Sequence, residues 1–411
     1  MKILHITCSD SGGAGWCVLR LHKSLLKLGV DSKMLVSNKS SDLATVFCAE
    51  ESGLNTYIPP QNQLLRRYEK IMRRRGCYLT PLEKYQRSAS CVMDKTLFTF
   101  PLSRFDLSNH PLVAEADVIH LHWVANFLDY PTFFQRVEKP IVWTFHDENI
   151  GFGGFHYQME KDKYYELCKD IEDKLWTIKA EALSLTKCSI HPVALSEMMK
   201  EFLGNVPVMN EFPPVVIHNS VDGDSFVPFS KSVARKIFGI PENNLVFGFC
   251  SVDLSDRRKG LRELLLALEQ LDDLSRITLI CAGEGIVPSQ TSCQIVKTGA
   301  LHNERIMSLF YSSADFFMMP SYQEAFAQTP IEAMACGVPV VAFPCSGTKD
   351  LINENNGIVC EDFSVESLLK GIKRALNVRY DARLIRQDVI NRFAPDVIAR
   401  QYIDLYQHAQ K

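Results

Sequence analysis

The chain has 411 residues, of which 46% are hydrophobic, which is enough for two domains of ordinary size with a core each. Its formal net charge at pH 7 is only −3, so no chain-wide basic excess supports a nucleic-acid-binding protein. The apolar run at residues 3–6 is too short for a signal peptide, and no stretch approaches the roughly 20 apolar residues of a membrane span. We therefore expect a cytoplasmic protein whose thirteen scattered cysteines are reduced thiols.

The N-terminal segment passes from an apolar run to a helical pattern. We expect a strand over residues 2–7, a loop with the sequence SDSGGAG, and a helix from about residue 14 to residue 28. Gly12 and Gly13 in this loop allow a ligand to approach the backbone, and the dipole of the following helix favours phosphate. The alternative is a tight turn in which small residues serve packing only. The adjacent glycines do not form the G-x-G-x-x-G dinucleotide fingerprint.

Residues 64–75, with the sequence LLRRYEKIMRRR, carry apolar and basic side chains at helical spacing on opposite faces. A basic amphipathic helix of this kind can lie on an anionic membrane surface or hold an anionic lipid phosphate. Peripheral contact with the inner face of the membrane is therefore one interpretation. The other is a solvated helix whose apolar side packs on the core.

Further strand patterns predict one parallel α/β domain over residues 1–218. They cover residues 117–123, 140–145, 191–195 and 215–218. His146 directly follows the second of these strands, at a carboxyl end where α/β proteins bind ligands; a structural histidine is the alternative. The glycine-rich residues 151–154 beyond it indicate a mobile loop. His120 and His122 share one strand face and could in principle hold a metal, but no third ligand is recognisable, so packing or cleft lining is expected instead.

The second half of the chain repeats the alternation. A turn signal at residues 219–222 and a polar stretch to residue 244 indicate a domain junction, which predicts a second domain over residues 219–390 and a C-terminal helix over residues 391–411. Strands are expected at residues 245–252, 276–282, 316–319 and 338–343. The expected fold class is therefore α/β with two Rossmann-like domains.

Two short segments of this second domain are candidates for contact with a ligand. Arg257, Arg258 and Lys259 precede a helix N-terminus, where cations are unfavourable to the helix dipole, so their presence favours a bound anion. A solvated charged turn is the alternative. Gly283 and Glu284 begin a G-E-G turn, which either lies near a ligand or is a plain turn.

The segment SYQEAFAQTPIEAMACGVPVVAFPCSGTKDLINENNG, residues 321–357, places Glu324 and Glu332 on either side of a helix start. Thr329 is expected as the N-cap and Glu332 as its capping-box partner. Strand, loop, helix and strand form a βαβ unit, so the amides of residues 325–328 are available to a diphosphate. Glu332 can accept hydrogen bonds from ribose hydroxyls and Glu324 can reach a sugar. Alternatively, Glu332 serves only as a cap.

This segment resembles the donor-binding signature E-G/A-F-x5-E-A-M-A-x-G-x-P-V-V of retaining glycosyltransferases of the GT-B fold, family 4. The matching positions are Glu324, Phe326, Glu332, Ala333, Met334, Ala335, Gly337, Pro339, Val340 and Val341. Ala325 and Ala327 stand where the family commonly has glycine, and Leu254 stands where many members have an arginine. The resemblance implies two Rossmann-like domains facing across a cleft, with the C-terminal helix crossing back to the first domain.

The resemblance also implies roles for the candidate residues. Glu324, His146 and Lys259 are the expected catalytic residues, with His146 on the donor sugar and Lys259 on the diphosphate beside an arginine that is either Arg257 or Arg258. The expected donor-binding residues are Gly12, Gly13, Arg257, Arg258, Lys259, Gly283, Glu284, Ala325, Phe326, Ala327 and Glu332. No metal and no cofactor beyond the donor substrate is expected.

The expected function is therefore transfer of a sugar from a nucleoside diphosphate sugar to a hydroxyl of a saccharide or lipid-linked acceptor, with retention, in polysaccharide or glycolipid biosynthesis. Two alternatives share the fold. One is a noncatalytic nucleotide-sugar-binding protein, and the other is a nucleotide-sugar epimerase, which needs no acceptor.

Overall fold

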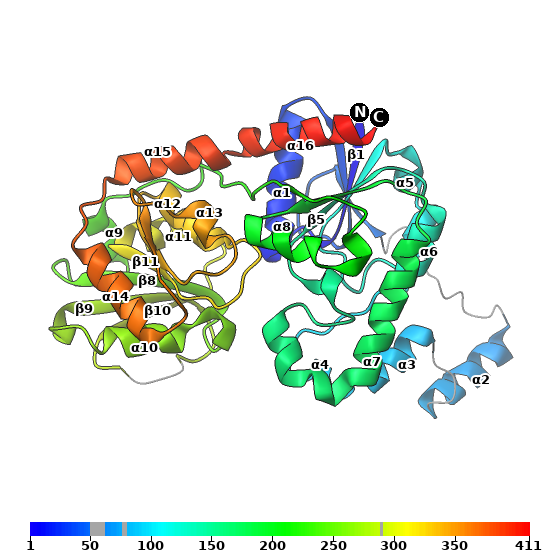
Figure 1. The fold of residues 1–411 in the computed structure, drawn as a ribbon, viewed down its shortest axis with the longest axis horizontal. Helices are drawn as coiled ribbons and strands as arrows, with labels where there is room; N and C mark the ends of the chain where they lie inside the picture. Colours follow the sequence, from blue (N-terminus) through cyan, green and yellow to red (C-terminus); the bar gives the residue numbers. More distant parts are fainter. Residues whose placement is uncertain (50–61, 76–79, 288–290) are drawn as a thin grey trace. The chain divides into compact units, whose positions relative to one another are not determined.

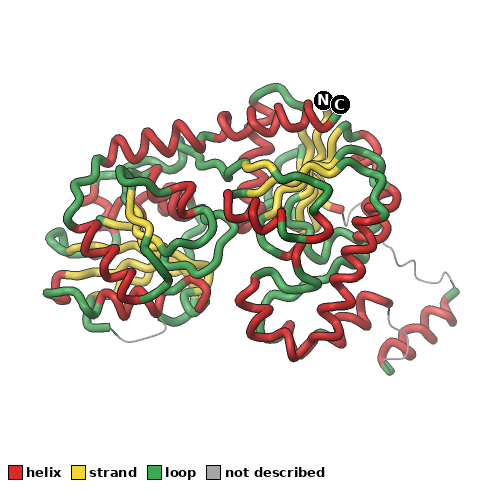
Figure 2. Tube along the Cα trace, viewed as in Figure 1, coloured by secondary structure: helices red, strands yellow, loops and turns green. Residues whose placement is uncertain are grey.

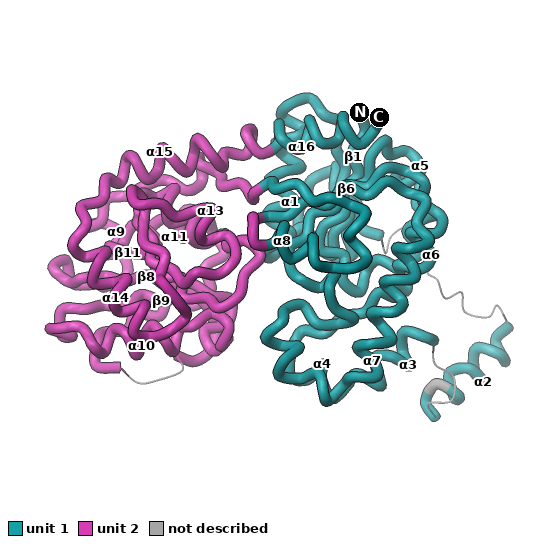
Figure 3. The backbone as a smooth tube through the Cα atoms, in the orientation of Figure 1, with its two compact units in different colours: residues 1–195, 199–217, 399–411 teal, residues 196–198, 218–398 magenta. Residues whose placement is uncertain are grey.

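The computed structural model describes residues 1–49, 62–75, 80–287 and 291–411. In these ranges the chain forms two compact units, coloured separately in Figure 3. Unit 1 contains Met1–Leu195, Met199–Ile217 and Ala399–Lys411, and unit 2 contains Ser196–Met198 and His218–Ile398. Each unit has its own parallel sheet with helices packed around it (Figures 1 and 2), so the predicted α/β class with two Rossmann-like domains is confirmed.

In the described residues of unit 1, seven parallel strands form one sheet in the order β3-β2-β1-β4-β5-β6-β7. The strands are β1 (Lys2–Ser9), β2 (Asp31–Asn38), β3 (Val46–Cys48), β4 (Val118–Leu121), β5 (Ile141–Phe145), β6 (Ile190–Ala194) and β7 (Val215–Val216). The chain adds β2 and β3 on one side of β1 and later strands on the other, which makes the β1–β4 pair the switch point of the sheet. In such sheets ligands bind at the carboxyl ends of the strands at this point.

Unit 1 also contains helices of very different lengths. They are α1 (Gly12–Lys27), α2 (Gln63–Arg74), α3 (Pro81–Ser88), α4 (Ser90–Met93), α5 (Pro111–Glu115), α6 (Tyr130–Arg136) and α7 (Gln158–Ser184), while α8 (Glu197–Gly204) and α16 (Pro395–Ala409) contribute residues to both units. The helix predicted at 64–75 is confirmed as α2. The predicted start of α1 was wrong, because Gly12 and Gly13 lie in its first turn and not in the preceding loop. Glycine is a poor helix former, which explains the late predicted start.

In the described part of unit 2, six parallel strands form the order β10-β9-β8-β11-β12-β13, with the switch point between β8 and β11. The strands are β8 (Leu245–Asp253), β9 (Ile277–Glu284), β10 (Gln294–Gly299), β11 (Phe316–Met319), β12 (Val340–Ala342) and β13 (Gly357–Val359). The helices are α9 (Lys231–Ile237), α10 (Leu261–Leu268), α11 (Glu304–Ser313), α12 (Gln328–Ala335), α13 (Thr348–Leu351), α14 (Val365–Leu376) and α15 (Ala382–Phe393). The short 3-10 helix η5 (Arg257–Lys259) links β8 to α10.

The central strands of both sheets are buried on both faces. All five residues of β5 and all four of β11 are buried, because helices cover a parallel sheet on either side. The strands β3 and β10 lie at the edges of their sheets and alternate between buried and exposed positions only weakly. Polar residues interrupt β10, and β3 is only three residues long, so neither strand gives the longer apolar run that predicted the central strands.

Candidate active site

The switch point of the second sheet brings two predicted site segments together. Lys259 lies at the end of η5, after β8, and Glu324 lies in the loop after β11. Since β8 and β11 are parallel neighbours, both segments leave the same edge of the sheet. The backbone N–H of Tyr322 donates a hydrogen bond of 2.9 Å to the carbonyl of Arg258, which fixes the two segments side by side.

Lys259 and Glu324 form an ion pair at this edge. The Nζ atom of Lys259 donates to Oε1 of Glu324 over 2.5 Å, and Nη1 of Arg258 lies 3.8 Å from Oε2. Burial alone would raise the pKa of Glu324, which is 8% exposed, but the charges of Lys259 and Arg258 outweigh burial and hold that pKa below its ordinary value. The site therefore holds one carboxylate and two cations close together, which gives these three groups a net charge of +1.

The structure separates the two arginines that the sequence left as alternatives. Arg258 is turned toward the site, because its Nη1 donates to the carbonyl of Gln323 over 2.9 Å and its Nη2 lies 3.2 Å from Oδ2 of Asp256. Asp256 also caps η5 through the backbone N–H of Arg258. The side chain of Arg257, in contrast, is exposed. Arg258 is thus the arginine that lies beside Lys259 and Glu324.

Two glycines allow this close approach. Gly260, which follows Lys259, has a φ of +70°, and a Cβ atom there would lie 1.9 Å from the carbonyl oxygen of Pro320. Gly283 has a φ of +138°, and a Cβ atom would lie 1.8 Å from the carbonyl oxygen of Ser251. A larger residue at position 260 would push apart the segments after β8 and β11, and one at position 283 would push apart the ends of β8 and β9. Glu284 is exposed beside Gly283, and its Oε1 accepts a hydrogen bond from the backbone of Ala300.

The helix start after Glu324 differs from its prediction. The helix α12 begins at Gln328 with Ala327 as N-cap and no side-chain cap, so the capping box between Thr329 and Glu332 was wrong. Both residues lie inside the helix. Oε2 of Glu332 instead accepts a hydrogen bond of 2.9 Å from the hydroxyl of Tyr311 on α11. The carboxylate is 7% exposed, and the N-cap residue Ala327 has no side chain that could cap the first turn of α12.

The loop between Glu324 and α12 is closely packed. The ring of Phe326 stacks on His218 at a centroid distance of 5.2 Å, and the carbonyl of Ala325 accepts hydrogen bonds from the hydroxyls of Ser196 and Ser346. Neither Ala325 nor Ala327 has a positive φ, so the backbone here does not require the glycines that are common in the signature. The two departures from the pattern are therefore compatible with the loop.

The switch point of the first sheet lies next to Gly12 and Gly13. Gly12 has a φ of +75°, and apart from the chain neighbours and the backbone of α1 itself, no described atom lies within 4 Å of the place where a Cβ would stand on either glycine. Gly15 differs, because its Cβ would lie 2.6 Å from the carbonyl of Ser9 and the helix must pack closely there. Gly15 thus fits the packing interpretation of this segment, whereas the space in front of Gly12 and Gly13 fits approach of a ligand.

His146 lies at the carboxyl end of β5, as the sequence predicted. Its Nε2 is 3.3 Å from Nδ1 of His122, which follows β4, and burial lowers the pKa of His146 to about 4. The next residue, Asp147, is held by the ring N–H of Trp123 at 2.6 Å and by Nδ1 of His156 at 2.6 Å. Burial alone would raise the pKa of Asp147, but His156 and these hydrogen bonds lower it.

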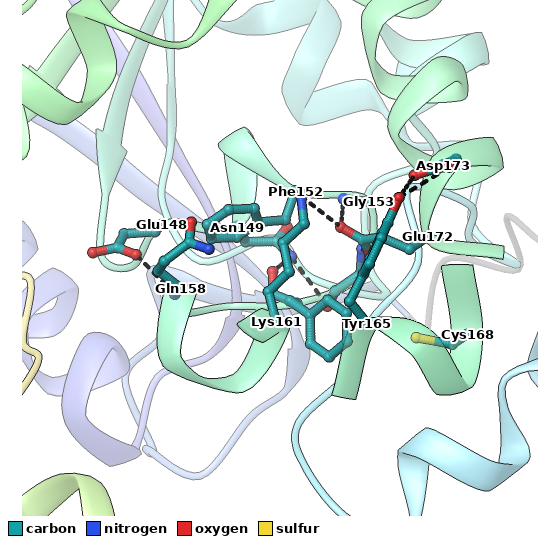
Figure 4. Close-up of polar contacts among 12 residues, drawn as sticks. Glu148, Asn149, Phe152, Gly153, Gln158, Lys161, Tyr165, Cys168, Glu172 and Asp173 are labelled. Atoms are coloured by element: carbon teal, nitrogen blue, oxygen red, sulfur yellow. Dashed lines mark hydrogen bonds and ion pairs between the residues drawn. The ribbon is translucent and has the colours of Figure 1, made fainter. Parts of the chain in front are cut away.

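The glycine-rich loop after Asp147 is tied to α7 by buried polar groups (Figure 4). The carboxylate of Glu172 accepts hydrogen bonds of 2.7 Å from the backbone N–H groups of Gly153 and Gly154. The ammonium group of Lys179 donates to the carbonyl of Phe152 and to both oxygens of Asn149, each over 2.8 Å. The glycines at these positions admit the buried contacts, and the mobility expected of this loop stays a prediction.

The helix α2 exposes its apolar face. Leu64 is 77% exposed, Leu65 53%, Tyr68 59% and Ile71 45%, so the interpretation in which this face packs on the core is wrong for these side chains. Arg67, Lys70 and Arg74 are also exposed. None of the helices that the structure describes has the length and hydrophobicity of a membrane span.

Comparison with known proteins shows what the second unit resembles. Residues 230–391 match the family described as glycosyl transferases group 1. An uncharacterized glycosyltransferase of Methanocaldococcus jannaschii is 24% identical over 73% of this chain and 77% of its own length. The Campylobacter jejuni N,N'-diacetylbacillosaminyl-diphospho-undecaprenol alpha-1,3-N-acetylgalactosaminyltransferase is 30% identical over 37% of this chain and 42% of its own length.

Solved structures match the fold over the whole chain. Sucrose-phosphate synthase of Thermosynechococcus elongatus has a TM-score of 0.66 at 17% identity and covers 99% of both chains. HepE of Anabaena in complex with UDP-glucose has a TM-score of 0.63 at 16% identity and covers 99% of this chain and 100% of its own. The fold is that of GT-B glycosyltransferases, and the chain carries a glycosyltransferase group 1 domain in its second half.

Proposed function

We propose that this protein is a glycosyltransferase that moves a sugar from a nucleoside diphosphate sugar to an acceptor hydroxyl with retention at the anomeric carbon. The observation that carries the proposal is the convergence of Lys259, Arg258 and Glu324 at the β8–β11 switch point, in a domain that matches glycosyl transferases group 1. Retention follows from the likeness of residues 324–341 to the family 4 signature.

The reaction breaks the bond between the anomeric carbon and the diphosphate oxygen, forms a bond from that carbon to the acceptor oxygen, and releases the proton of the acceptor hydroxyl. The diphosphate gains charge as it departs. Lys259 and Arg258 can offset this charge, and the amides of the first turn of α12 can donate to the phosphate oxygens. These groups can act without a divalent metal, so we propose a metal-independent transfer.

The two carboxylates of unit 2 take different parts of the donor. Glu332, on the first turns of α12, accepts from the ribose hydroxyls, and Glu324, beside Lys259, contacts the sugar. Gly283 and Glu284 lie near the base at the end of β9. The solved structure of HepE with UDP-glucose shows that this fold can hold such a donor, which supports but does not identify the donor used here.

Unit 1 supplies further contacts in this proposal. His146 binds the donor sugar, and the open space at Gly12 and Gly13 admits the donor diphosphate and the acceptor. The acceptor is a saccharide or a lipid-linked saccharide, and the product belongs to polysaccharide or glycolipid biosynthesis. The Campylobacter relative, whose name specifies a diphospho-undecaprenol acceptor, supports a lipid-linked compound of this class.

The exposed helix α2 supports peripheral contact with an anionic membrane, such as the inner face of the cytoplasmic membrane. Four apolar side chains are exposed on a helix that also exposes Arg67, Lys70 and Arg74. Apolar insertion together with attraction to anionic headgroups is the usual basis of interfacial helix binding. A lipid-linked acceptor would then be presented at the same surface.

The test is a mass-spectrometric screen of nucleotide sugars, each with and without saccharide and lipid-linked acceptors. A glycosylated acceptor and an equal amount of nucleoside diphosphate are expected for the true pair. A donor that binds but is never consumed would instead indicate a noncatalytic binding protein. Conversion of the donor without an acceptor into an epimer would indicate an epimerase of the same fold.

A further inference from the structure

Three histidines of unit 1 form a line that ends at His146. Nδ1 of His5 on β1 lies 3.0 Å from Nε2 of His122, and Nδ1 of His122 lies 3.3 Å from Nε2 of His146. Each contact joins two ring nitrogens, so one nitrogen of each pair must carry the proton and the other must accept it. His5 and His122 are 0% and 4% exposed, while His146 is partly exposed.

All three rings are neutral near pH 7. Burial lowers the pKa of His5 and His122 well below the ordinary value, and it lowers that of His146 to about 4. A neutral imidazole has one N–H and one lone pair, so the protonation of one ring dictates that of the next. Only two arrangements are consistent: every hydrogen bond points from His5 toward His146, or every one points the other way.

The buried end of the line selects between them. Nε2 of His5 has no hydrogen-bond partner among the described residues. If the bonds pointed toward His5, this atom would carry a buried N–H without an acceptor. If they point toward His146, it carries only an unused lone pair, and orphaned buried N–H groups are rarer in proteins than under-used acceptors. The direction from His5 to His146 is therefore favoured.

We infer that His5 and His122 are positioning residues that fix His146 in the tautomer with its proton on Nδ1. His122 donates from Nδ1 to Nε2 of His146, so Nδ1 of His146 presents an N–H. Nδ1 of His146 has no hydrogen bond to a described residue, and the side chain of His146 is partly exposed. His146 thus acts as a hydrogen-bond donor to a sugar hydroxyl. This role rests on the proposed function.

The neighbouring His120 does not belong to this line. Its Nδ1 is 2.7 Å from the hydroxyl of Tyr406 and its Nε2 is 2.8 Å from that of Thr144, so both nitrogens are in use. Its ring packs on His122 at a centroid distance of 3.8 Å. His5, His120 and His122 each offer one nitrogen within 4.8 Å of the others, but both nitrogens of His120 already have hydrogen-bond partners. No carboxylate of the described chain joins this buried group, so a divalent charge there would be uncompensated.

The direct test reads the tautomers by nitrogen-15 NMR of the whole protein labelled only at histidine. Two-bond and three-bond correlations from the ring protons distinguish a protonated nitrogen from one with a lone pair, and His146→Gln identifies the signals of His146. The inference requires protonated Nδ1 and unprotonated Nε2 in His146 at neutral pH. A protonated Nε2 in His146 would overturn it. This readout is independent of activity, so it can succeed or fail separately from the proposed function.

Two variants of His122 give a matched comparison. The amide nitrogen of asparagine stands as many bonds from Cα as Nδ1 of histidine, and that of glutamine as many as Nε2. His122→Asn therefore keeps a donor toward His146, whereas His122→Gln loses it. With the donor identified by the screen, kcat for His122→Gln is expected about tenfold below that of His122→Asn, the value of one hydrogen bond.

The same pair of variants excludes a purely structural role for His122. Both variants lose the packing of the imidazole, so equal kcat values, with His146 in one tautomer in both, would overturn the positioning role. Metal analysis of the purified protein completes the test. The inference would also be overturned if the wild-type protein contained one equivalent of a transition metal and the His5→Gln variant contained none. In that case Nε2 of His122 would bind the metal and could not accept a hydrogen bond from His5.

Discussion

The Nζ atom of Lys259 lies 2.5 Å from Oε1 of Glu324, in an ion pair that joins the segments after β8 and β11. The pair accounts for the lowered pKa of a buried carboxylate, and it keeps both side chains at the carboxyl edge of the sheet. A bound diphosphate would compete with Glu324 for Lys259.

Glu324→Gln is expected to lower kcat strongly while leaving nucleoside diphosphate affinity unchanged or higher. Glutamine keeps the size of the side chain and removes its charge, so Lys259 is released to the phosphate oxygens. Steady-state kinetics for transfer and calorimetric titration with the nucleoside diphosphate measure the two effects separately. A parallel loss of turnover and nucleotide affinity would contradict the placement of Glu324 on the sugar.

Glu332→Ala is expected to weaken donor binding by about 1.5 to 3 kcal/mol, because it removes charge-assisted hydrogen bonds to the ribose. Calorimetry with the intact donor measures this loss. The matched control is Tyr311→Phe, which removes the hydroxyl that donates to Glu332 but leaves the carboxylate in place. Unchanged donor affinity in Glu332→Ala, together with a lower melting temperature, would show that Glu332 only stabilises the contact between α11 and α12.

Lys179 predicts a pH dependence of stability. Burial lowers its pKa from the ordinary 10.5 to about 7, so between these values the unfolded state holds a proton that the folded state lacks. The unfolding free energy should therefore rise with pH from about 7 to about 10.5, relative to that of Lys179→Met. Denaturant unfolding at several pH values measures this difference.

The control for Lys179 is Lys174→Met, on the exposed side of the same helix. Its unfolding free energy should follow the wild-type protein across the same range. If the difference between wild type and Lys179→Met stayed constant from pH 7 to pH 10.5, Lys179 would have an ordinary pKa and the burial argument would fail.

The cations of α2 are expected to support membrane binding. Changing Arg67, Lys70 and Arg74 to Gln should remove about 1 kcal/mol of attraction per charge near an anionic surface. Sedimentation with anionic vesicles at low and physiological salt measures the effect. A control with the same change in net charge replaces Lys163, Lys169 and Lys174 of α7, which are exposed.

Two results would contradict the membrane proposal for α2. Wild-type protein that stays in the supernatant at both salt concentrations would leave a soluble saccharide as the better acceptor. Equal loss of sedimentation in the two triple variants would show that net charge matters and the position on α2 does not.

The sequence predicted the central strands, the helix α2 and the positions of Lys259 and Glu324 at strand ends, because long apolar runs and turn residues determine these features locally. It did not predict the edge strands β3 and β10, whose partial exposure weakens the pattern. The capping box at Thr329 failed because Glu332 has a buried partner, Tyr311, from another helix. Local spacing cannot show such a partner.

The same limit applies to the polar groups of unit 1. His5 lies 115 positions or more before its partners in the chain, and only the pairing of β1 with β4 brings it to His120 and His122. Glu172 and Lys179 are ordinary charged residues of a long helix in the sequence. Their burial beneath the loop of residues 149–154 depends on how that loop packs. The glycines of the loop indicated mobility and gave no sign of this packing.

The central claim is that Lys259 stabilises the departing diphosphate. Its most direct test compares the transfer kinetics of Lys259→Ala with those of the control Arg262→Ala, since the side chain of Arg262 lies three residues further on and is exposed. Charge on the departing diphosphate grows in the transition state, so kcat for Lys259→Ala should fall by about a hundredfold to a thousandfold, with a much smaller change in donor KM. Arg262→Ala should match the wild-type protein, and transfer should persist in EDTA. An unchanged kcat in Lys259→Ala, or transfer that EDTA abolishes and a divalent ion restores, would contradict the account.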